Sequence, residues 1–254
     1  MREVEWNRLG APELTALAKK DAVVLLPVGS TEQHGPHLPT GVDHFLVQEV
    51  SLRSARLLSD RMPIVVAPTV WCGLADHHVP FGGTFSLTLL TYHALLRDLC
   101  RSILDAGFSK IVVVNGHAGN IAGLSSITAD LTRELGVAIG TVTYFMVAAK
   151  ALEEILEEQK GLMHACEAET SMMMAIAPEL VESSRLGEAH GSSFDVAANL
   201  IPTLKSFVTF DKLTPSGVLG DARRSTVEKG EKLLSACATE IARRLANGEP
   251  WNRA

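Results

Sequence analysis

The chain has 254 residues and a net charge of -6 at pH 7; 46% of its residues are hydrophobic and 20% are charged. This balance is typical of a compact globular protein and excludes a mainly disordered chain. The sequence has no dense run of Lys and Arg of the kind that neutralises phosphates, so we expect no nucleic-acid partner. The length suits one α/β domain, which we expect to span residues 1–254.

The beginning of the chain, MREVEWNRLGAPELTALAKKD, mixes charged and apolar residues and lacks the apolar core of a signal peptide. No stretch approaches the roughly 18 apolar residues of a membrane span. The four cysteines are scattered and form no CxxC pair, which excludes a zinc ribbon and a dense disulfide framework. We therefore expect a cytoplasmic protein without a membrane partner.

Short runs rich in Val and Ile predict buried strands at 22–28, 63–70, 110–115 and 137–145. Segments with apolar residues three and four apart predict helices at 43–61, 91–107, 120–136, 146–159 and 225–246. The region from 182 to 222 is less regular. Alternating strands and helices predict an α/β fold, a three-layer α/β/α sandwich with a mainly parallel central sheet.

Polar segments follow the first three predicted strands. They are GSTEQHGPHLPTGVDHF, WCGLADHHVPFGG and NGHAGN. Parallel sheets bind ligands beyond the carboxyl ends of their strands, so we expect these loops to share one rim.

The first loop carries Glu32 and His34, which are two residues apart and leave the same side of an extended backbone. Asp43 follows at the start of the next predicted helix, where a carboxylate can equally serve as a cap for the free amides of the first turn. Taken alone, Asp43 therefore allows a structural and a functional interpretation.

The other two segments add His117, on a small-residue loop directly after a strand, and Glu169, in HACEAETS. Glu169 precedes the apolar run TSMMMAIA, and a buried carboxylate without a partner would be costly. Two imidazoles and three carboxylates form a mixed set that suits one or two ions of zinc, manganese or iron(II). Such a metal lowers the pKa of water toward roughly 7, as hydrolases require.

Other catalytic classes find less support in the sequence. There is no HExxH, GxSxG or GxxxxGK[ST] motif, and no GxGxxG turn for a nucleotide-dependent oxidoreductase. A cysteine hydrolase built on Cys166 and His164 lacks an identifiable oxyanion hole. A non-catalytic protein that binds a metal or ligand on the same scaffold remains an alternative.

The three segments PVGSTEQHGPHLP, NGHAGN and HACEAETS, in this order and spacing, resemble the creatininase (creatinine amidohydrolase) family. The resemblance extends from about residue 20 to 235 and implies a metal-dependent hydrolase of amide-type C–N bonds in a small, often cyclic substrate. It also implies a homo-oligomer, usually a hexamer.

By position, the resemblance implies metal ligation by Glu32, His34, Asp43 and His117, with Asp43 bridging two ions. Glu169 matches a ligand or a position that supports a ligand. His164 matches the catalytic histidine, which would donate a proton to the leaving nitrogen or stabilise the oxyanion.

Three further histidines lie near these motifs. We expect His78, in ADHHVPFGG, to lie on the rim and touch the substrate, and its neighbour His77 to be a solvated loop residue. We expect His37 to donate a hydrogen bond to a ligand carboxylate.

The chain departs from creatininases proper at two places. They carry a glutamate where this chain has Gly119, and a tryptophan-bearing flap where it has FMVAAKALEEILEEQKGLM. Creatinine is therefore not the expected substrate. Other branches of the family cleave a formamide, trim a peptide in mycofactocin maturation, or hydrolyse a cyclic ketone.

Overall fold

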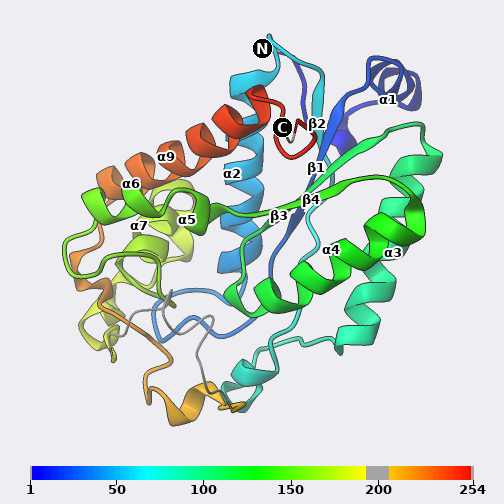
Figure 1. Cartoon of the computed structure of the whole chain (residues 1–254). Coiled ribbons are helices and arrows are strands. Elements are labelled where there is room, and N and C mark those ends of the chain that lie inside the picture. The colour runs from blue at the N-terminus through cyan, green and yellow to red at the C-terminus, as the bar shows by residue number, and fades with distance from the viewer. Residues whose placement is uncertain (1, 193–205, 253–254) are drawn as a thin grey trace.

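The structure is a computed structural model that describes residues 2–192 and 206–252. Its centre is a sheet of four strands in the order β2-β1-β3-β4 (Figure 1). The strands are β1 (Val23–Val28), β2 (Ile64–Val66), β3 (Lys110–Asn115) and β4 (Ile139–Thr143). Neighbouring strands pair in parallel, with Val28 opposite Asn115 at the ends of β1 and β3. The loops that follow these two strands therefore leave the same edge of the sheet.

Side chains of the strands point alternately into two apolar clusters, one on each face of the sheet. Val23 and Leu25 of β1 belong to one cluster, and Val24 and Leu26 belong to the other. The first cluster is covered by α2 (Val42–Leu58), α7 (Glu167–Ile176) and α9 (Val227–Ala246). The second is covered by α1 (Ala11–Ala18), α3 (Leu89–Asp105) and α4 (Ile121–Leu135). This arrangement confirms the predicted α/β sandwich with its parallel sheet (Figure 1).

The second strand is shorter than the run of 63–70 that the sequence predicts. The N–H of Ala67 still donates to the carbonyl of Leu25, but Pro27 of β1 has no N–H to donate back to this segment. The ladder with β1 therefore ends, and Val70 returns only as an isolated bridge to Val28.

The expected helix at 146–159 is also broken. The chain forms α5 (Tyr144–Val147) and α6 (Ala149–Ile155) instead. The backbone N–H groups of Glu157 and Glu158 donate to the buried carboxylate of Glu167, which draws the chain out of the helix after Ile155.

Short 3-10 helices connect the larger elements. They are η1 (Trp6–Arg8), η2 (Asp76–Phe81), η3 (Ala118–Asn120), η4 (Pro178–Leu180), η5 (Ser183–Glu188), η6 (Phe210–Lys212) and η7 (Ala222–Arg224). The 3-10 helices η5 and η6 lie within the irregular region predicted at 182–222 and η7 begins at its end; residues 193–205 of this region lie outside the described residues. None of the helices in the described ranges is long and apolar enough to cross a membrane.

Candidate metal centre

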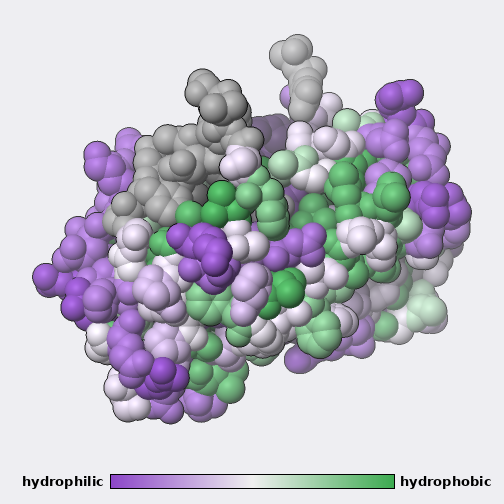
Figure 2. All heavy atoms as spheres, turned by 90° about the horizontal axis from the view of Figure 1, so that it is seen from below, coloured by the Kyte–Doolittle hydropathy of each residue, from purple (hydrophilic) through white to green (hydrophobic). Residues whose placement is uncertain are grey.

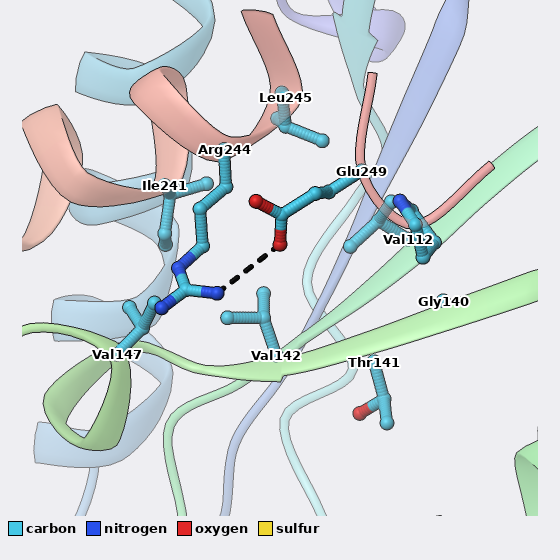
Figure 3. Close-up of a pocket in the computed structure, with 10 residues that line it drawn as sticks. Val112, Gly140, Thr141, Val142, Val147, Ile241, Arg244, Leu245 and Glu249 are labelled. Carbon is cyan, nitrogen blue, oxygen red and sulfur yellow. Dashed lines mark hydrogen bonds and ion pairs between the residues drawn. The ribbon is translucent and has the colours of Figure 1, made fainter. Parts of the chain in front are cut away.

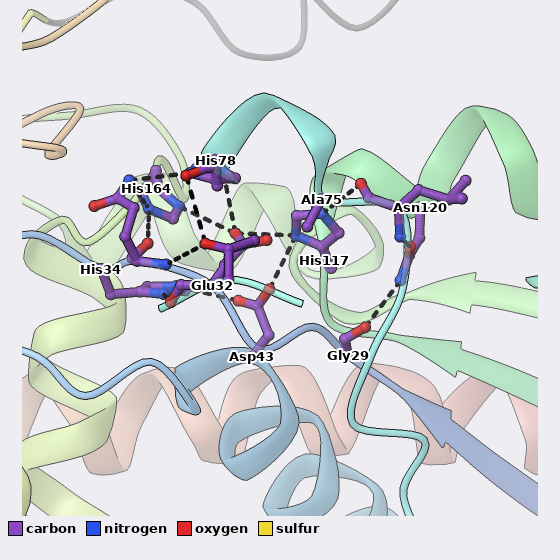
Figure 4. A network of polar contacts seen from close by, with 12 residues as sticks. Gly29, Glu32, His34, Asp43, Ala75, His78, His117, Asn120 and His164 are labelled. Carbon is purple, nitrogen blue, oxygen red and sulfur yellow. Dashed lines mark hydrogen bonds and ion pairs between the residues drawn. The ribbon is translucent and has the colours of Figure 1, made fainter. Parts of the chain in front are cut away.

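The five side chains that the sequence singles out as ligands lie together at the carboxyl edge of the sheet. Glu32 and His34 come from the loop after β1, Asp43 from the first turn of α2, His117 from the loop after β3 and Glu169 from the first turn of α7. Each exposes no more than 3% of its surface. Figure 4 shows Glu32, His34, Asp43 and His117 directed toward one another.

Asp43 occupies the middle of this cluster. Its Oδ1 lies 3.3 Å from His34 Nε2 and its Oδ2 lies 2.9 Å from His117 Nδ1. Helix α2 begins after Gly41 without a side-chain cap. The Asp43 carboxylate is therefore directed at the two imidazoles, which favours the functional interpretation of this residue over simple capping.

The ligand atoms form overlapping groups. Among the described residues, Glu32, Asp43 and His117 bring one ligand atom each within 4.8 Å of the others, and so do His34, Asp43 and Glu169. A third group consists of Glu32, His34 and His164. Asp43 is shared by the first two groups, so the geometry can hold two neighbouring cations with one carboxylate between them.

Backbone carbonyls orient both imidazoles. His34 Nδ1 lies 3.1 Å from the carbonyl oxygen of Glu32, and His117 Nε2 lies 3.2 Å from that of Leu74. A carbonyl only accepts, so each of these nitrogens donates its hydrogen. The other nitrogen of each ring, His34 Nε2 or His117 Nδ1, faces the carboxylates and can bind a cation in place of a proton, as in metal-binding histidines.

Four ligand atoms make no hydrogen bond of regular geometry in the part of the chain that the structure describes, and three of them face an imidazole or carboxylate of the same site at 2.9–3.3 Å instead. The four are Glu32 Oε1, Glu32 Oε2, His34 Nε2 and Asp43 Oδ2, all buried. Leaving buried polar atoms unsatisfied is costly, and for charged groups more so. The residues present therefore fit a divalent cation with nitrogen and oxygen ligands.

The titration behaviour of the cluster is that of crowded, buried charges. Burial raises the pKa of Glu32, and it raises the pKa of Glu169 to about 8. Burial disfavours the protonated form of His34, but Asp43 and then Glu169 outweigh it and raise the pKa of His34 to about 9. Burial also opposes ionisation of Asp43, yet the contacts with His117 and His34 lower the pKa of Asp43 overall. The cluster thus gathers positive charge around Asp43.

His164 and His78 lie beside the cluster. His164 Nδ1 is 3.6 Å and His78 Nε2 is 3.2 Å from Glu32 Oε1. Burial, followed by the charge of His34, holds the pKa of His164 well below its usual value. His164 is therefore neutral near pH 7, the state in which one of its ring nitrogens has a lone pair.

A cavity of about 180 Å³ opens over these groups. Its lining combines polar groups, which include Glu32, Asp43 and His164, with the apolar side chains of Phe145, Leu162, Phe210 and Leu219. The volume suits a small organic molecule with its polar part at the ligands. Seen from this side of the molecule, hydrophobic and hydrophilic residues are interspersed over the surface (Figure 2).

His78 is 1% exposed and lines the cavity. His77 differs from the expectation of a solvated loop residue, because it also lines the cavity and its ring lies nearly parallel to that of His117, with centroids 5.6 Å apart. His37 Nε2 lies 2.7 Å from Thr170 Oγ1 rather than near a ligand carboxylate.

Sequence reasoning missed two residues of the site. Gln33, which stands between two predicted ligands, contacts both His78 and His164 through its amide. Phe210 packs its ring 4.2 Å from that of His78 and reaches the site from a distant segment without a recognisable motif.

The structure gives no support to a cysteine nucleophile. Cys166 is fully buried, and its sulfur accepts the N–H of Met163. Burial, followed by the charge of Glu169, raises the pKa of Cys166 to about 12. The thiolate form that such a mechanism needs is therefore scarce at neutral pH.

A second cavity, of about 130 Å³, lies between β4 and α9 (Figure 3). Its walls are mostly apolar, and an ion pair joins Arg244 Nη1 to Glu249 Oε2 at 3.1 Å. It contains none of the predicted site residues.

Comparison with known proteins identifies the family. The family profile described as "Creatininase: Creatinine amidohydrolase" matches residues 7–245. A mycofactocin precursor peptide peptidase of Mycolicibacterium smegmatis is 32% identical over 245 residues, which cover 95% of this chain and 92% of the relative. Creatinine amidohydrolase of Pseudomonas putida is 27% identical over 257 residues, with coverage of 94% and 93%.

Solved structures agree with the sequence comparisons. A crystal structure of creatinine amidohydrolase has a TM-score of 0.82 at 26% identity and covers 98% of this chain and 99% of that one. Further solved creatininases are described as manganese and zinc–zinc forms. Since the family profile and the relatives match nearly the whole length, the chain belongs to the creatininase family of hydrolases that act on carbon–nitrogen bonds.

Proposed function

We propose that the chain is a metal-dependent amidohydrolase that cleaves an amide-type C–N bond in a small substrate. The observation that carries this proposal is the convergence around Asp43 of buried carboxylate and imidazole atoms that lie within 4.8 Å of one another in two groups that share this residue. A neutral histidine, His164, and a cavity of about 180 Å³ adjoin this set.

In this proposal Glu32, Asp43 and His117 hold one cation, and His34, Asp43 and Glu169 hold a second. The ligand types suit zinc, manganese or iron(II). When bound, a divalent cation supplies Lewis-acid chemistry, which polarises a carbonyl group and lowers the pKa of water to near 7.

The chain's own contribution to proton transfer comes from His164. Its Nε2 lies 2.7 Å from the main-chain carbonyl of Gln33, so Nε2 carries the hydrogen and Nδ1 is unprotonated. Nδ1 can therefore take the proton of the attacking water and pass it to the leaving nitrogen. His78 lines the cavity beside Glu32 and is expected to contact the substrate.

Two candidate substrate classes follow from the cavity and the relatives. A small amide, formamide or lactam suits the volume and the apolar wall of Phe145 and Phe210. A peptide end is the second candidate, because a relative that is 32% identical is described as a mycofactocin precursor peptide peptidase. Gly119 in place of the glutamate of creatininases makes creatinine the less favoured substrate.

The test is a screen of zinc- or manganese-loaded protein against formamides, lactams, small linear amides and short peptides. For a substrate that is turned over, His164→Ala is expected to lower kcat by about 10²- to 10⁴-fold, since a general acid–base group is removed. Metal content should stay unchanged. His93→Ala is the matched control, because His93 is paired with Asp130 on the surface.

A result in which no compound of the panel is turned over, or in which His164→Ala and His93→Ala behave alike, would favour the alternative of a non-catalytic binding protein.

A further inference from the structure

The side chain of Gln33 is buried beside the candidate metal centre although glutamine is not expected as a ligand there. It is 7% exposed, and the backbone N–H of Gly35 donates to its Oε1 at 2.9 Å. This hydrogen bond fixes which end of the amide carries oxygen. The Nε2 end lies 3.0 Å from His78 Nδ1, 3.0 Å from His164 Nε2 and 3.1 Å from the carbonyl oxygen of Gly217.

The main chain of Gln33 determines the proton position on His164. His164 Nε2 lies 2.7 Å from the Gln33 carbonyl oxygen, which only accepts, so Nε2 carries the hydrogen. A ring nitrogen that carries a hydrogen has no lone pair to accept another. The contact between Gln33 Nε2 and His164 Nε2 is therefore not a hydrogen bond.

The two hydrogens of the Gln33 amide must then go to its other two neighbours, His78 Nδ1 and the carbonyl of Gly217. Because Nδ1 of His78 accepts, the neutral ring carries its hydrogen on Nε2. That nitrogen lies 3.2 Å from Glu32 Oε1. Because of the Gln33 side chain, the ring nitrogen of His78 that faces Glu32, Nε2, carries a hydrogen and has no free lone pair.

The surroundings of the amide are shaped to hold it. Gly35 and Gly217 have φ values of +67° and +77°, in the region that favours glycine. A Cβ at Gly217 would collide with Gln33 Oε1. The backbone on both sides of the amide therefore follows a path that only small residues permit.

We propose that Gln33 is a positioning residue that determines which ring nitrogen carries the proton in His78 and in His164. Its side-chain amide keeps the proton of His78 on Nε2, next to Glu32, and its main-chain carbonyl keeps the proton of His164 on Nε2. His164 Nδ1, 3.6 Å from Glu32 Oε1, is then unprotonated. Its effect on turnover rests on the proposed function. The proton positions belong to the protein alone and can be measured without a substrate.

The test is Gln33→Glu in the full, zinc-loaded chain. The carboxylate has the shape of the amide but only accepts hydrogen bonds when ionised, so the proton of His78 should move to Nδ1. The proton of His164 should stay on Nε2, since the main-chain carbonyl is retained. Long-range ¹H–¹⁵N spectra of protein labelled at histidine report both proton positions. The peaks are assigned with variants in which one histidine at a time is replaced.

For a compound that the screen finds to be hydrolysed, kcat should fall about 10- to 100-fold in Gln33→Glu, while KM changes less because Gln33 does not line the cavity. Gln159→Glu is the matched control. Gln159 is equally buried and donates to the carbonyl of Gly161, and its side chain is bonded to none of the site histidines in the described contacts. It should change neither the proton positions nor kcat.

A wild-type spectrum with the His78 proton on Nδ1 would overturn the proposal, and so would a His78 proton that stays on Nε2 in Gln33→Glu. If Gln33→Glu does not fold, Gly217→Ala is the second variant, because it displaces the same amide. In Gly217→Ala too, the proton of His78 should no longer be held on Nε2. Expected proton positions without any turnover would contradict the proposed function alone. Turnover with the His78 proton on Nδ1 would contradict the positioning role alone.

Discussion

Asp43 links two imidazoles from separate segments of the chain: its Oδ1 lies 3.3 Å from His34 Nε2 and its Oδ2 lies 2.9 Å from His117 Nδ1. Both imidazoles are also held by backbone carbonyls, so Asp43 meets two rings of fixed orientation. This relationship makes Asp43 the residue common to both proposed cation positions.

Replacement of Asp43 should therefore affect metal binding more than replacement of any other ligand. We expect Asp43→Asn to lose most of the bound metal, because the two ligand groups that share Asp43 each lose a carboxylate. Glu169→Gln should lose only the ion held with His34. Elemental analysis after desalting measures the metal content per chain. Asp76→Asn, an exposed carboxylate near the site, is the control; metal content in Asp43→Asn equal to that of the control would contradict the shared role.

Gly119→Ala should weaken metal binding through His117. A Cβ at Gly119 would collide with His117 Nε2 and come within 2.6 Å of the Leu74 carbonyl oxygen, which receives the hydrogen of that ring. Loss of such an orienting hydrogen bond typically lowers metal affinity about 10- to 100-fold.

Competition with a metal-binding dye measures this affinity for Gly119→Ala. Gly161→Ala is the control, since its Cβ meets open space. Equal affinities of the two variants would show that the ring of His117 does not depend on this contact.

The free energy of unfolding should depend on Lys229, because this residue neutralises the buried carboxylate of Glu167. Lys229 Nζ lies 2.6 Å from Glu167 Oε1, and Glu167 has no exposed surface. Lys229→Met leaves this charge without its cation and should lower the free energy of unfolding by roughly 3–5 kcal/mol. Urea unfolding measures the loss.

The double variant Lys229→Met/Glu167→Gln should recover much of that loss, because the buried charge is removed. Arg185→Met, which breaks the exposed pair with Glu188, should change stability little. A Lys229→Met variant as stable as Arg185→Met would contradict the argument.

His37 should make the free energy of unfolding depend on pH. Burial, followed by the charge of His34, lowers the pKa of His37 from 6.5 to about 4. The unfolded chain then binds more protons between these values, so the contribution is complete above about pH 6.5 and is lost as pH falls toward 4. The shift corresponds to about 3 kcal/mol.

The free energy of unfolding at pH 7.5 and 4.5 tests this contribution. The decrease between the two pH values should be smaller in His37→Gln than in the wild type by about that amount. Identical decreases would mean that His37 titrates normally in the folded protein.

Much of the fold could be predicted from the sequence because the strands are covered on both faces. The run at β1 is apolar throughout and that at β3 is apolar between Lys110 and Asn115, and the structure places both strands within one residue of the predicted bounds. The helix at 146–159 could not be predicted, since its break depends on the carboxylate of Glu167, about ten residues further along.

The candidate site, too, could be predicted from the sequence only in part. Glu32, Asp43 and His117 could be grouped from the sequence because each follows or adjoins the carboxyl end of a strand in one parallel sheet. Gln33 could not, because its role lies in which hydrogens it donates, and this depends on the carbonyl of Gly217, 184 residues away. Phe210 reaches His78 only through tertiary packing.

The most direct test of the central claim is hydrolysis by the wild-type chain before and after removal of metal. With a substrate from the screen, turnover should fall to background after chelation and dialysis and return on addition of zinc or manganese, whereas Asp43→Asn should remain inactive at the same metal concentration. Turnover that persists in protein shown by elemental analysis to be free of metal would contradict the account.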